Sequence, residues 1–130
     1  ITEHSRHIRE SQRLIVVHPD WWGMPPAILK GWIDRLFRPG FAYEFEGEQF
    51  AEKQQVPLLT GKRAMLVTTT DESNPLSQEA IKTIWRDRVF AFAGITDVEF
   101  RCFYGLRESS SRERQEWLSQ LCGMVERWST

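Results

Sequence analysis

Three short apolar runs, separated by segments with helical periodicity, constrain the fold of this chain more than any other feature of its sequence. They lie at residues 13–18 (RLIVVH), 62–69 (KRAMLVTT) and 98–104 (VEFRCFY). The first two runs show no alternation of apolar and polar residues, which is typical of strands that helices cover on both faces. We therefore interpret the three runs as strands of one parallel sheet.

Four further segments have the spacing of helices. Between 27 and 37, pairs of apolar residues recur every four positions and form one broad apolar face, and Pro26 suits the first helical position because its missing N–H would be unpaired there. The last helix starts with a capping box of Ser110 and Glu113, and Gly94 is a suitable stop for the helix before it. The predicted helices are 2–12, 27–37, 76–93 and 110–128, and the expected inner face of the last one is Leu118, Leu121, Val125 and Trp128.

Helices and strands alternate along the chain, which indicates right-handed crossovers and an α/β fold. The segment 41–59 lacks either pattern, so we interpret it as an irregular excursion over the surface. Three strands make a narrow sheet, and the strand at 14–17 would expose a long apolar edge. We expect that edge to be covered by N-terminal strands missing from this chain or by another subunit. Because the chain starts within a helix and without methionine, we expect residues 1–130 to be the C-terminal portion of a single domain.

Composition argues against several classes of function. Lys and Arg number 17 against 18 Asp and Glu, and the net charge of −1 gives no reason to expect nucleic acid or an anionic membrane as partner. No apolar run approaches the roughly 20 residues of an integral membrane segment. Cys102 and Cys122 are too few for a disulfide framework and lack zinc-ligand spacing, so we expect a reducing, cytoplasmic setting and no metal. Six tryptophans and eight phenylalanines are the one anomaly.

Ligands of open parallel sheets bind beyond the carboxyl ends of the strands, where loops lead into helices. Three such loops follow the predicted strands, at 18–26, 68–75 and 104–109. The first contains Trp21 and Trp22 and leads to a helix N-terminus, which has a partial positive charge. The second offers successive threonine hydroxyls. A stacking surface and hydrogen-bond donors around one crevice suit a planar ring with polar edges, such as a flavin or a nucleobase.

The stretch HPDWWGMPPAILKGWIDRLFRPGFAYEF, residues 18–45, resembles the signature of the flavodoxin-like NAD(P)H:quinone oxidoreductases. That signature is a strand followed by P-x-x-W, then PA-I-LKGW-x-(D/E)R-x-F, then GFAY. The resemblance implies a flavodoxin-like open parallel sheet with helices on both faces, with three strands in this chain and the N-terminal strands missing. The matching residues are Pro19, Trp22, Pro26, Ala27, Ile28, Leu29, Lys30, Gly31, Trp32, Arg35, Phe37, Phe41, Ala42 and Tyr43.

The resemblance also implies an enzyme. It would be a homodimeric, flavin-dependent NAD(P)H:quinone oxidoreductase that binds FAD or FMN and passes hydride from NAD(P)H to the flavin and then to a quinone-like acceptor. Tyr43 would be its catalytic residue, overhanging the neighbouring subunit's site, and Trp22, Tyr43 and Phe45 would form the substrate pocket. The implied cofactor-binding residues are Pro19, Asp20, Trp21, Trp22 and Gly23 along the ring, and Thr68, Thr69, Thr70 and Asp71 at its pyrimidine side.

The sequence departs from the family pattern at several positions. Asp71 and Glu72 stand where many members have two glycines, and their charges would oppose an anionic reduced flavin unless the loop takes a different path. Phe45 replaces a second tyrosine, and the family's phosphate-cradling loop is not in this sequence. Two alternatives stay open. One is a regulatory flavodoxin-like subunit of a partner such as a potassium-efflux transporter, and the other is a dimerising scaffold without cofactor.

Two residues of the signature stretch are assigned structural roles. Trp32 lies on the apolar face of its predicted helix, so we expect it in the core. His18, at the end of a strand, we interpret as a structural histidine whose hydrogen bonds are satisfied.

Overall fold

The computed structural model describes residues 2–48 and 53–129 of the chain. Its centre is a sheet of β1 (Arg13–Pro19), β4 (Arg63–Thr69) and β5 (Asp97–Phe103), which are parallel and lie in the order β1-β4-β5. In the register, the first residues of the three strands are neighbours, and so are the last. The three predicted strands and their parallel arrangement are confirmed.

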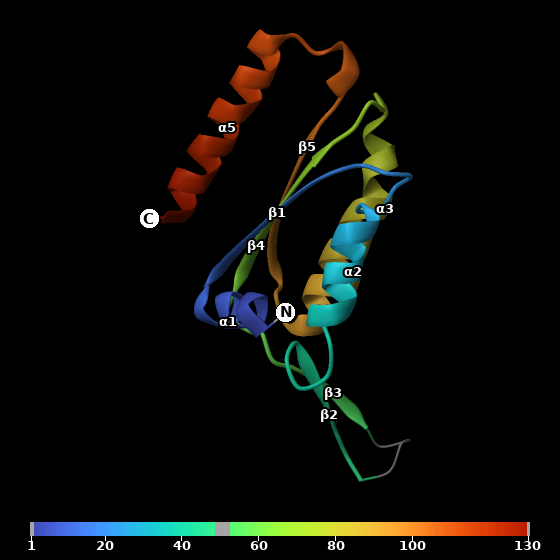
Figure 1. Ribbon diagram of the computed structural model, residues 1–130, viewed down its shortest axis with the longest axis vertical. Coiled ribbons are helices and arrows are strands. Elements are labelled where there is room, and N and C mark those ends of the chain that lie inside the picture. Colours follow the sequence, from blue (N-terminus) through green and yellow to red (C-terminus); the bar gives the residue numbers. More distant parts are fainter. Residues whose placement is uncertain (1, 49–52, 130) are drawn as a thin grey trace.

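Helices cover both faces of the sheet, as predicted (Figure 1). α2 (Ala27–Leu36) and a helical stretch at 75–93 lie on one side, and α5 (Ser111–Ser129) lies on the other. The predicted capping box starts α5: the Ser110 amide donates to the Glu113 carboxylate at 2.7 Å, and the Glu113 amide donates to the Ser110 hydroxyl at 3.2 Å. α1 (Thr2–Glu10) precedes β1. In the described part of the chain, no helix combines the length and the apolar character that crossing a bilayer requires.

The helical stretch at 75–93 changes type along its length. It begins with a 3₁₀ turn, continues as α3, becomes π-helical and ends as α4, so the predicted helix is confirmed in extent but not in type. Gly94 ends it with φ +91°, as predicted, and a Cβ at this glycine would lie 2.8 Å from Pro57 Cβ. The parts are the turn Pro75–Gln78, α3 (Glu79–Lys82), the π-helical segment Thr83–Phe90 and α4 (Ala91–Ala93).

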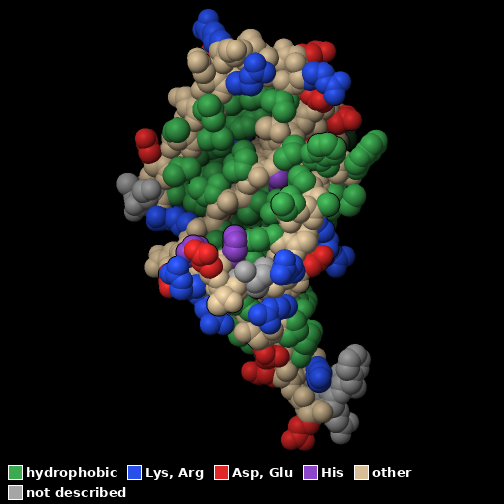
Figure 2. Space-filling model, viewed as in Figure 1, with side chains coloured by type: hydrophobic (Ala, Val, Ile, Leu, Met, Phe, Trp, Pro, Cys, Tyr) green, Lys and Arg blue, Asp and Glu red, His purple; other side chains and the backbone are tan. Residues whose placement is uncertain are grey.

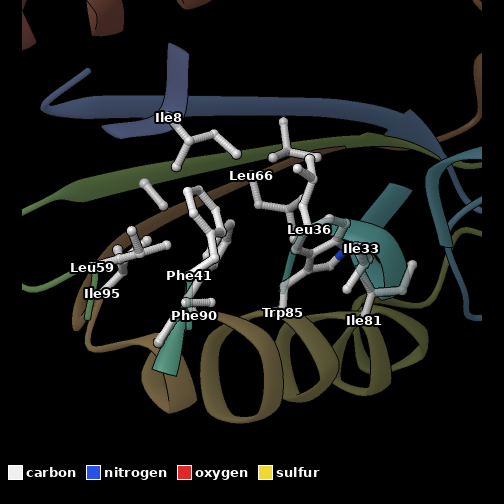
Figure 3. Packing of buried hydrophobic residues seen from close by; sticks show 14 residues of the cluster. Ile8, Ile33, Leu36, Phe41, Leu59, Leu66, Ile81, Trp85, Phe90 and Ile95 are labelled. Carbon is white, nitrogen blue, oxygen red and sulfur yellow. The ribbon is translucent and has the colours of Figure 1, made fainter. Parts of the chain in front are cut away.

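The main core lies between the sheet and the helices on the α2 side. Trp85 and Phe90 are fully buried there, with ring centroids 5.3 Å apart. Trp32, which was expected in the core, is partly buried and packs against the edge of this core, so that prediction is confirmed in part. Figure 3 shows the convergence of side chains from both helices and from β4; the labelled residues are Ile8, Ile33, Leu36, Phe41, Leu59, Leu66, Ile81, Trp85, Phe90 and Ile95.

The inner face of α5 was predicted only in part. Leu121 and Trp128 pack against the sheet, but Leu118 is 62% exposed and Val125 is 38% exposed. The residues that pack in their place are Trp117 and Met124. Both sets have helical spacing, and the difference arises because the Trp117 ring stacks on Phe103 at 5.0 Å, which turns the helix toward that side.

β1 is not covered on both faces, contrary to the expectation from its sequence. His18 and Val16 are buried under α2, whereas Ile15 is 47% exposed and Val17 is 63% exposed on the opposite face. A helix about 10 Å wide covers about two strands spaced about 4.8 Å apart. α5 packs on β4 and β5 and leaves β1 open. Figure 2 shows apolar side chains, in green, gathered on the face of the molecule where β1 lies in front in Figure 1.

The segment predicted to be irregular contains an antiparallel hairpin. β2 (Tyr43–Glu46) pairs with β3 (Gln54–Pro57), and Figure 1 shows this hairpin projecting at the opposite end of the molecule from the loops that follow β1, β4 and β5. The prediction was wrong because each strand has only four residues, too few for a clear period. The alternation of aromatic and acidic residues in YEFE was the available signal.

Candidate functional site

The loops that follow the three parallel strands meet at one edge of the sheet. The Asp20 amide donates to the Thr69 carbonyl at 2.7 Å, and the Thr70 amide donates to the Phe103 carbonyl at 2.9 Å. The Leu106 amide in turn donates to the Thr70 carbonyl at 3.1 Å. These bonds continue the sheet pattern past the strand ends, so the three loops start from a rigid edge.

The first loop displays Trp22 on a strained turn. The amides of Trp21 and Met24 each donate to the other residue's carbonyl at 3.1 Å, and the two residues between them have positive φ, +61° for Trp22 and +73° for Gly23. Two positive φ values define a type I′ turn, which asparagine and glycine favour. Any other residue type in this left-handed backbone conformation destabilises the turn by about 1–2 kcal/mol. Trp22 is nevertheless 92% exposed, so neither local propensity nor burial explains an indole here.

The Asp20 carboxylate ties this turn to its surroundings. One of its oxygens accepts the Gly23 amide at 2.7 Å. The other accepts the Gln78 side-chain amide at 2.9 Å and the Thr70 hydroxyl at 3.3 Å. The carboxylate therefore connects the turn with the second loop and with the helical stretch that follows it.

The first carboxylate of the second loop is bound by the third loop. Asp71 accepts the Arg107 amide at 2.7 Å and forms an ion pair with the Arg107 guanidinium at 3.2 Å. The Thr70 hydroxyl accepts the Glu72 amide at 3.1 Å, which makes the loop compact. Arg107 thus offsets one of the two charges that we expected to oppose a reduced flavin. Sequence reasoning missed Arg107 because it comes from the third loop.

A cleft of about 480 Å³ lies between the first two loops. Five of the residues implied by the family resemblance line it: Asp20, Trp22, Gly23, Thr70 and Asp71. Glu72, which the sequence analysis noted as a departure from the family pattern, lines it too. Sequence reasoning missed Ser73 and Ser77, and the available signal was the polar residues around the Asn74–Pro75 turn.

Four other implied cofactor residues do not line this cleft. The Thr68 side chain is fully buried, and its hydroxyl donates to Gln78 at 3.0 Å. Thr69 contributes its carbonyl to the sheet edge, as described above. Pro19 lines a separate apolar groove of about 320 Å³ beside α2. Trp21 is exposed outside the cleft.

Tyr43 and Phe45 are not brought to this cleft within one chain. Both lie in the β2–β3 hairpin, with ring centroids 5.5 Å apart, and Tyr43 also packs edge-on against Phe92 at 4.7 Å. Tyr43 lines a separate cavity of about 200 Å³ together with Arg88 and Phe92. The pocket expected from Trp22, Tyr43 and Phe45 therefore does not form from a single copy.

His18 is a structural histidine, as predicted. Its Nδ1 lies 2.7 Å from the Pro19 carbonyl, an acceptor, so Nδ1 bears the proton and Nε2 accepts the Trp85 indole N–H at 2.9 Å. Burial lowers the pKa of His18 and keeps the ring neutral. Burial also raises the pKa of the Cys102 thiol, which disfavours the thiolate form. The described residues contain no group of three or more His, Cys, Asp or Glu side chains placed to hold a metal ion.

The chain is similar to quinone oxidoreductases over much of its length. An FMN-dependent NADH:quinone oxidoreductase of Cereibacter sphaeroides is 36% identical over 110 residues, which are 81% of this chain and 53% of that protein. Human ribosyldihydronicotinamide dehydrogenase [quinone] is 41% identical over 70 residues, 54% of this chain and 28% of that protein. The crystal structure of Smu.1420 from Streptococcus mutans superimposes with a TM-score of 0.79 at 27% identity, covering 94% of this chain and 63% of that chain.

The chain spans about half the length of the Cereibacter relative. Residues 1–123 match the Flavodoxin_2 family, whose description is a flavodoxin-like fold. The parallel order of β1, β4 and β5, the helices on both faces and the cleft at the carboxyl edge agree with that match. The chain therefore belongs to the Flavodoxin_2 family of flavodoxin-like proteins.

Proposed function

We propose that this chain forms the flavin-binding edge of an NAD(P)H:quinone oxidoreductase. The observation that carries the proposal is Trp22, an exposed indole on a strained turn beside a cleft of about 480 Å³. Strained backbone at a cleft is typical of functional sites. The Cereibacter relative is named an FMN-dependent NADH:quinone oxidoreductase. That name favours FMN over FAD as the cofactor, and it favours NADH over NADPH as the electron donor.

The residues of the cleft fit a flavin. An indole face that stands free in solvent offers a stacking surface for a planar ring, and the hydroxyls of Ser73 and Ser77 offer polar contacts for its edge. Trp22, Gly23 and Thr70 would hold the ring. When bound, the flavin supplies the redox chemistry, taking a hydride from NAD(P)H and giving two electrons to a quinone.

The protein's own contribution is orientation and charge. The Asp20 carboxylate fixes the turn through the Gly23 amide, so the stacking face is held before the ring arrives. Arg107 offsets the charge of Asp71, while the carboxylates of Asp20 and Glu72 leave net negative charge in the lining. That charge disfavours anionic acceptors relative to neutral quinones.

We also propose that the enzyme is a homodimer in which Tyr43 and Phe45 complete the cleft of the second copy. The hairpin lies at the opposite end of the molecule from the loops that line the cleft (Figure 1), so a role of Tyr43 in a cleft would require the cleft of another copy. Phe45 and Phe92 leave an aromatic surface partly exposed beside it. The two free cysteines support a reducing compartment, and we propose the cytoplasm.

The test uses the full-length protein, purified without added cofactor. We expect an absorption band near ~450 nm, FMN identified by mass after release, and NADH oxidation when a soluble quinone is added. Trp22→Ala should weaken FMN retention, while Trp21→Ala, which changes an indole outside the cleft, should leave it unchanged. A native protein that neither retains FMN nor oxidises NADH would contradict the proposal.

A further inference from the structure

Gln78 is a fully buried amide at the start of the helical stretch behind the cleft. It does not line the cleft itself. The next residues of this stretch that are fully buried, Ile81 and Trp85, present apolar side chains to the core. An apolar side chain at position 78 would continue that face, whereas a buried amide costs free energy unless it is hydrogen-bonded. Its hydrogen bonds therefore explain its place.

Both ends of this amide are bonded. The Thr68 hydroxyl donates to Oε1 at 3.0 Å, and Nε2 donates to the Asp20 carboxylate at 2.9 Å. The other oxygen of that carboxylate accepts the Gly23 amide at 2.7 Å. A continuous line of hydrogen bonds thus runs from the interior of β4, through Gln78 and Asp20, to the turn that displays Trp22.

We propose that Gln78 is a positioning residue of the flavin site: it fixes the Asp20 carboxylate, which holds the turn and with it the indole face of Trp22. The role in flavin binding rests on the proposed function, whereas the hold on the turn does not. A turn with two left-handed residues needs support from its surroundings. Without Gln78, the second carboxylate oxygen keeps only the Thr70 hydroxyl at 3.3 Å, and the carboxylate can rotate away from Gly23.

Two substitutions separate positioning from packing. Gln78→Met keeps the length of the side chain and removes both hydrogen bonds. Gln78→Glu keeps them only while the introduced carboxyl is protonated, because a carboxylic acid can donate to Asp20 and accept from Thr68 as the amide does. Once it ionises, two carboxylates at this distance repel. Gln120→Met, an exposed position on α5, is the matched control.

The pH range is chosen so that neighbouring groups do not dominate. Burial lowers the pKa of His18 and raises the pKa of Cys102, the two titratable groups on β1 and β5 that Asp20 influences. Both side chains are neutral over most of the range from about pH 5.5 to 8. Measuring the native protein in parallel corrects for any titration of these groups within that range. The charged groups on the adjoining loops and helix are Asp71 with Arg107, Glu72, and Glu79 with Lys82.

Two readouts are measured in the full-length protein: the dissociation constant for FMN, and the hydrogen exchange of the peptide 20–24 without flavin. We expect Gln78→Met to weaken FMN binding about tenfold at every pH and to speed the exchange. Gln78→Glu should match the native protein near pH 5.5 and be about tenfold weaker near pH 8. A merely structural role would lower the melting temperature of both variants without this recovery at acidic pH.

The inference is overturned if both variants bind FMN within about twofold of the native protein across the range and exchange at the native rate. If Gln78→Met does not fold, the pH profile of Gln78→Glu decides the question. If the native protein binds no FMN, the proposed function fails, and the exchange of peptide 20–24 still tests the hold of Gln78 on the turn.

Discussion

Replacing Trp22 with asparagine separates the strain of the turn from its use in binding. An ordinary side chain in the left-handed region costs about 1–2 kcal/mol, and asparagine is the residue that the first central position of a type I′ turn favours. Because the indole is 92% exposed, its removal uncovers little apolar surface. We expect the free energy of unfolding of the flavin-free protein to rise by about 1 kcal/mol, which raises the melting temperature by a few degrees.

The same substitution should weaken FMN binding about tenfold, because a stacked aromatic face contributes roughly 1–3 kcal/mol to binding a planar ring. The assay is thermal unfolding without flavin, followed by titration with FMN. Trp21→Asn is the control, since Trp21 is also exposed but has no positive φ, so this substitution should gain no stability. A lower melting temperature for Trp22→Asn would refute the strain, and an unchanged FMN affinity would refute the stacking.

Three further predictions concern the helix stop, the buried histidine and the cleft charge. Gly94→Ala should destabilise the protein by roughly 2 kcal/mol or more, because the added Cβ would lie 2.8 Å from Pro57 Cβ and the backbone has φ +91°. Gly123→Ala, within α5, should instead stabilise the protein by about 0.5–1 kcal/mol. Urea unfolding measures both changes. Because burial lowers the pKa of His18 in the folded protein, the unfolded chain takes up a proton on His18 at a higher pH than the folded chain does. The free energy of unfolding should therefore fall as pH drops below about 6.5. Equal free energies of unfolding at pH 5.5 and 7.5, after subtraction of the change seen in His18→Gln, would contradict this. Glu72→Gln should raise kcat/KM about threefold for a sulfonated naphthoquinone relative to menadione, and an unchanged ratio would show that this charge does not select the acceptor.

The sequence predicted the elements whose period is long enough to be read. The strands at 13–18 and 62–69 were predictable because short continuous apolar runs are typical of buried strands. The helix at 27–37 was predictable because its apolar pairs repeat over three turns. The hairpin was missed because four residues a strand give barely two periods. The π-helical segment was missed because its hydrogen-bond pattern has no counterpart in residue type.

The site was predicted at the level of loops rather than of side chains. Topology alone brings the ends of β1, β4 and β5 to one edge, so the loops were correct. Which threonine faces the cleft depends on where β4 ends: Thr68 lies within the strand and is fully buried, whereas Thr70 is the first residue after it and lines the cleft. The partners Gln78 and Arg107 could not be predicted, because each comes from a different element and meets its carboxylate only in the folded chain.

The equal length of the three parallel strands limits which insertions and deletions the site tolerates. β1, β4 and β5 each have seven residues and end in register, so the loops around the cleft depart from a common level. A single-residue deletion within β4 would transfer the remaining side chains of that strand to the opposite face. Thr68 would then lose Gln78, and Met65 or Val67 would lose its place under α5. Variation that preserves the cleft is therefore confined to the loops, where an inserted or exchanged residue leaves the alternation of the sheet intact.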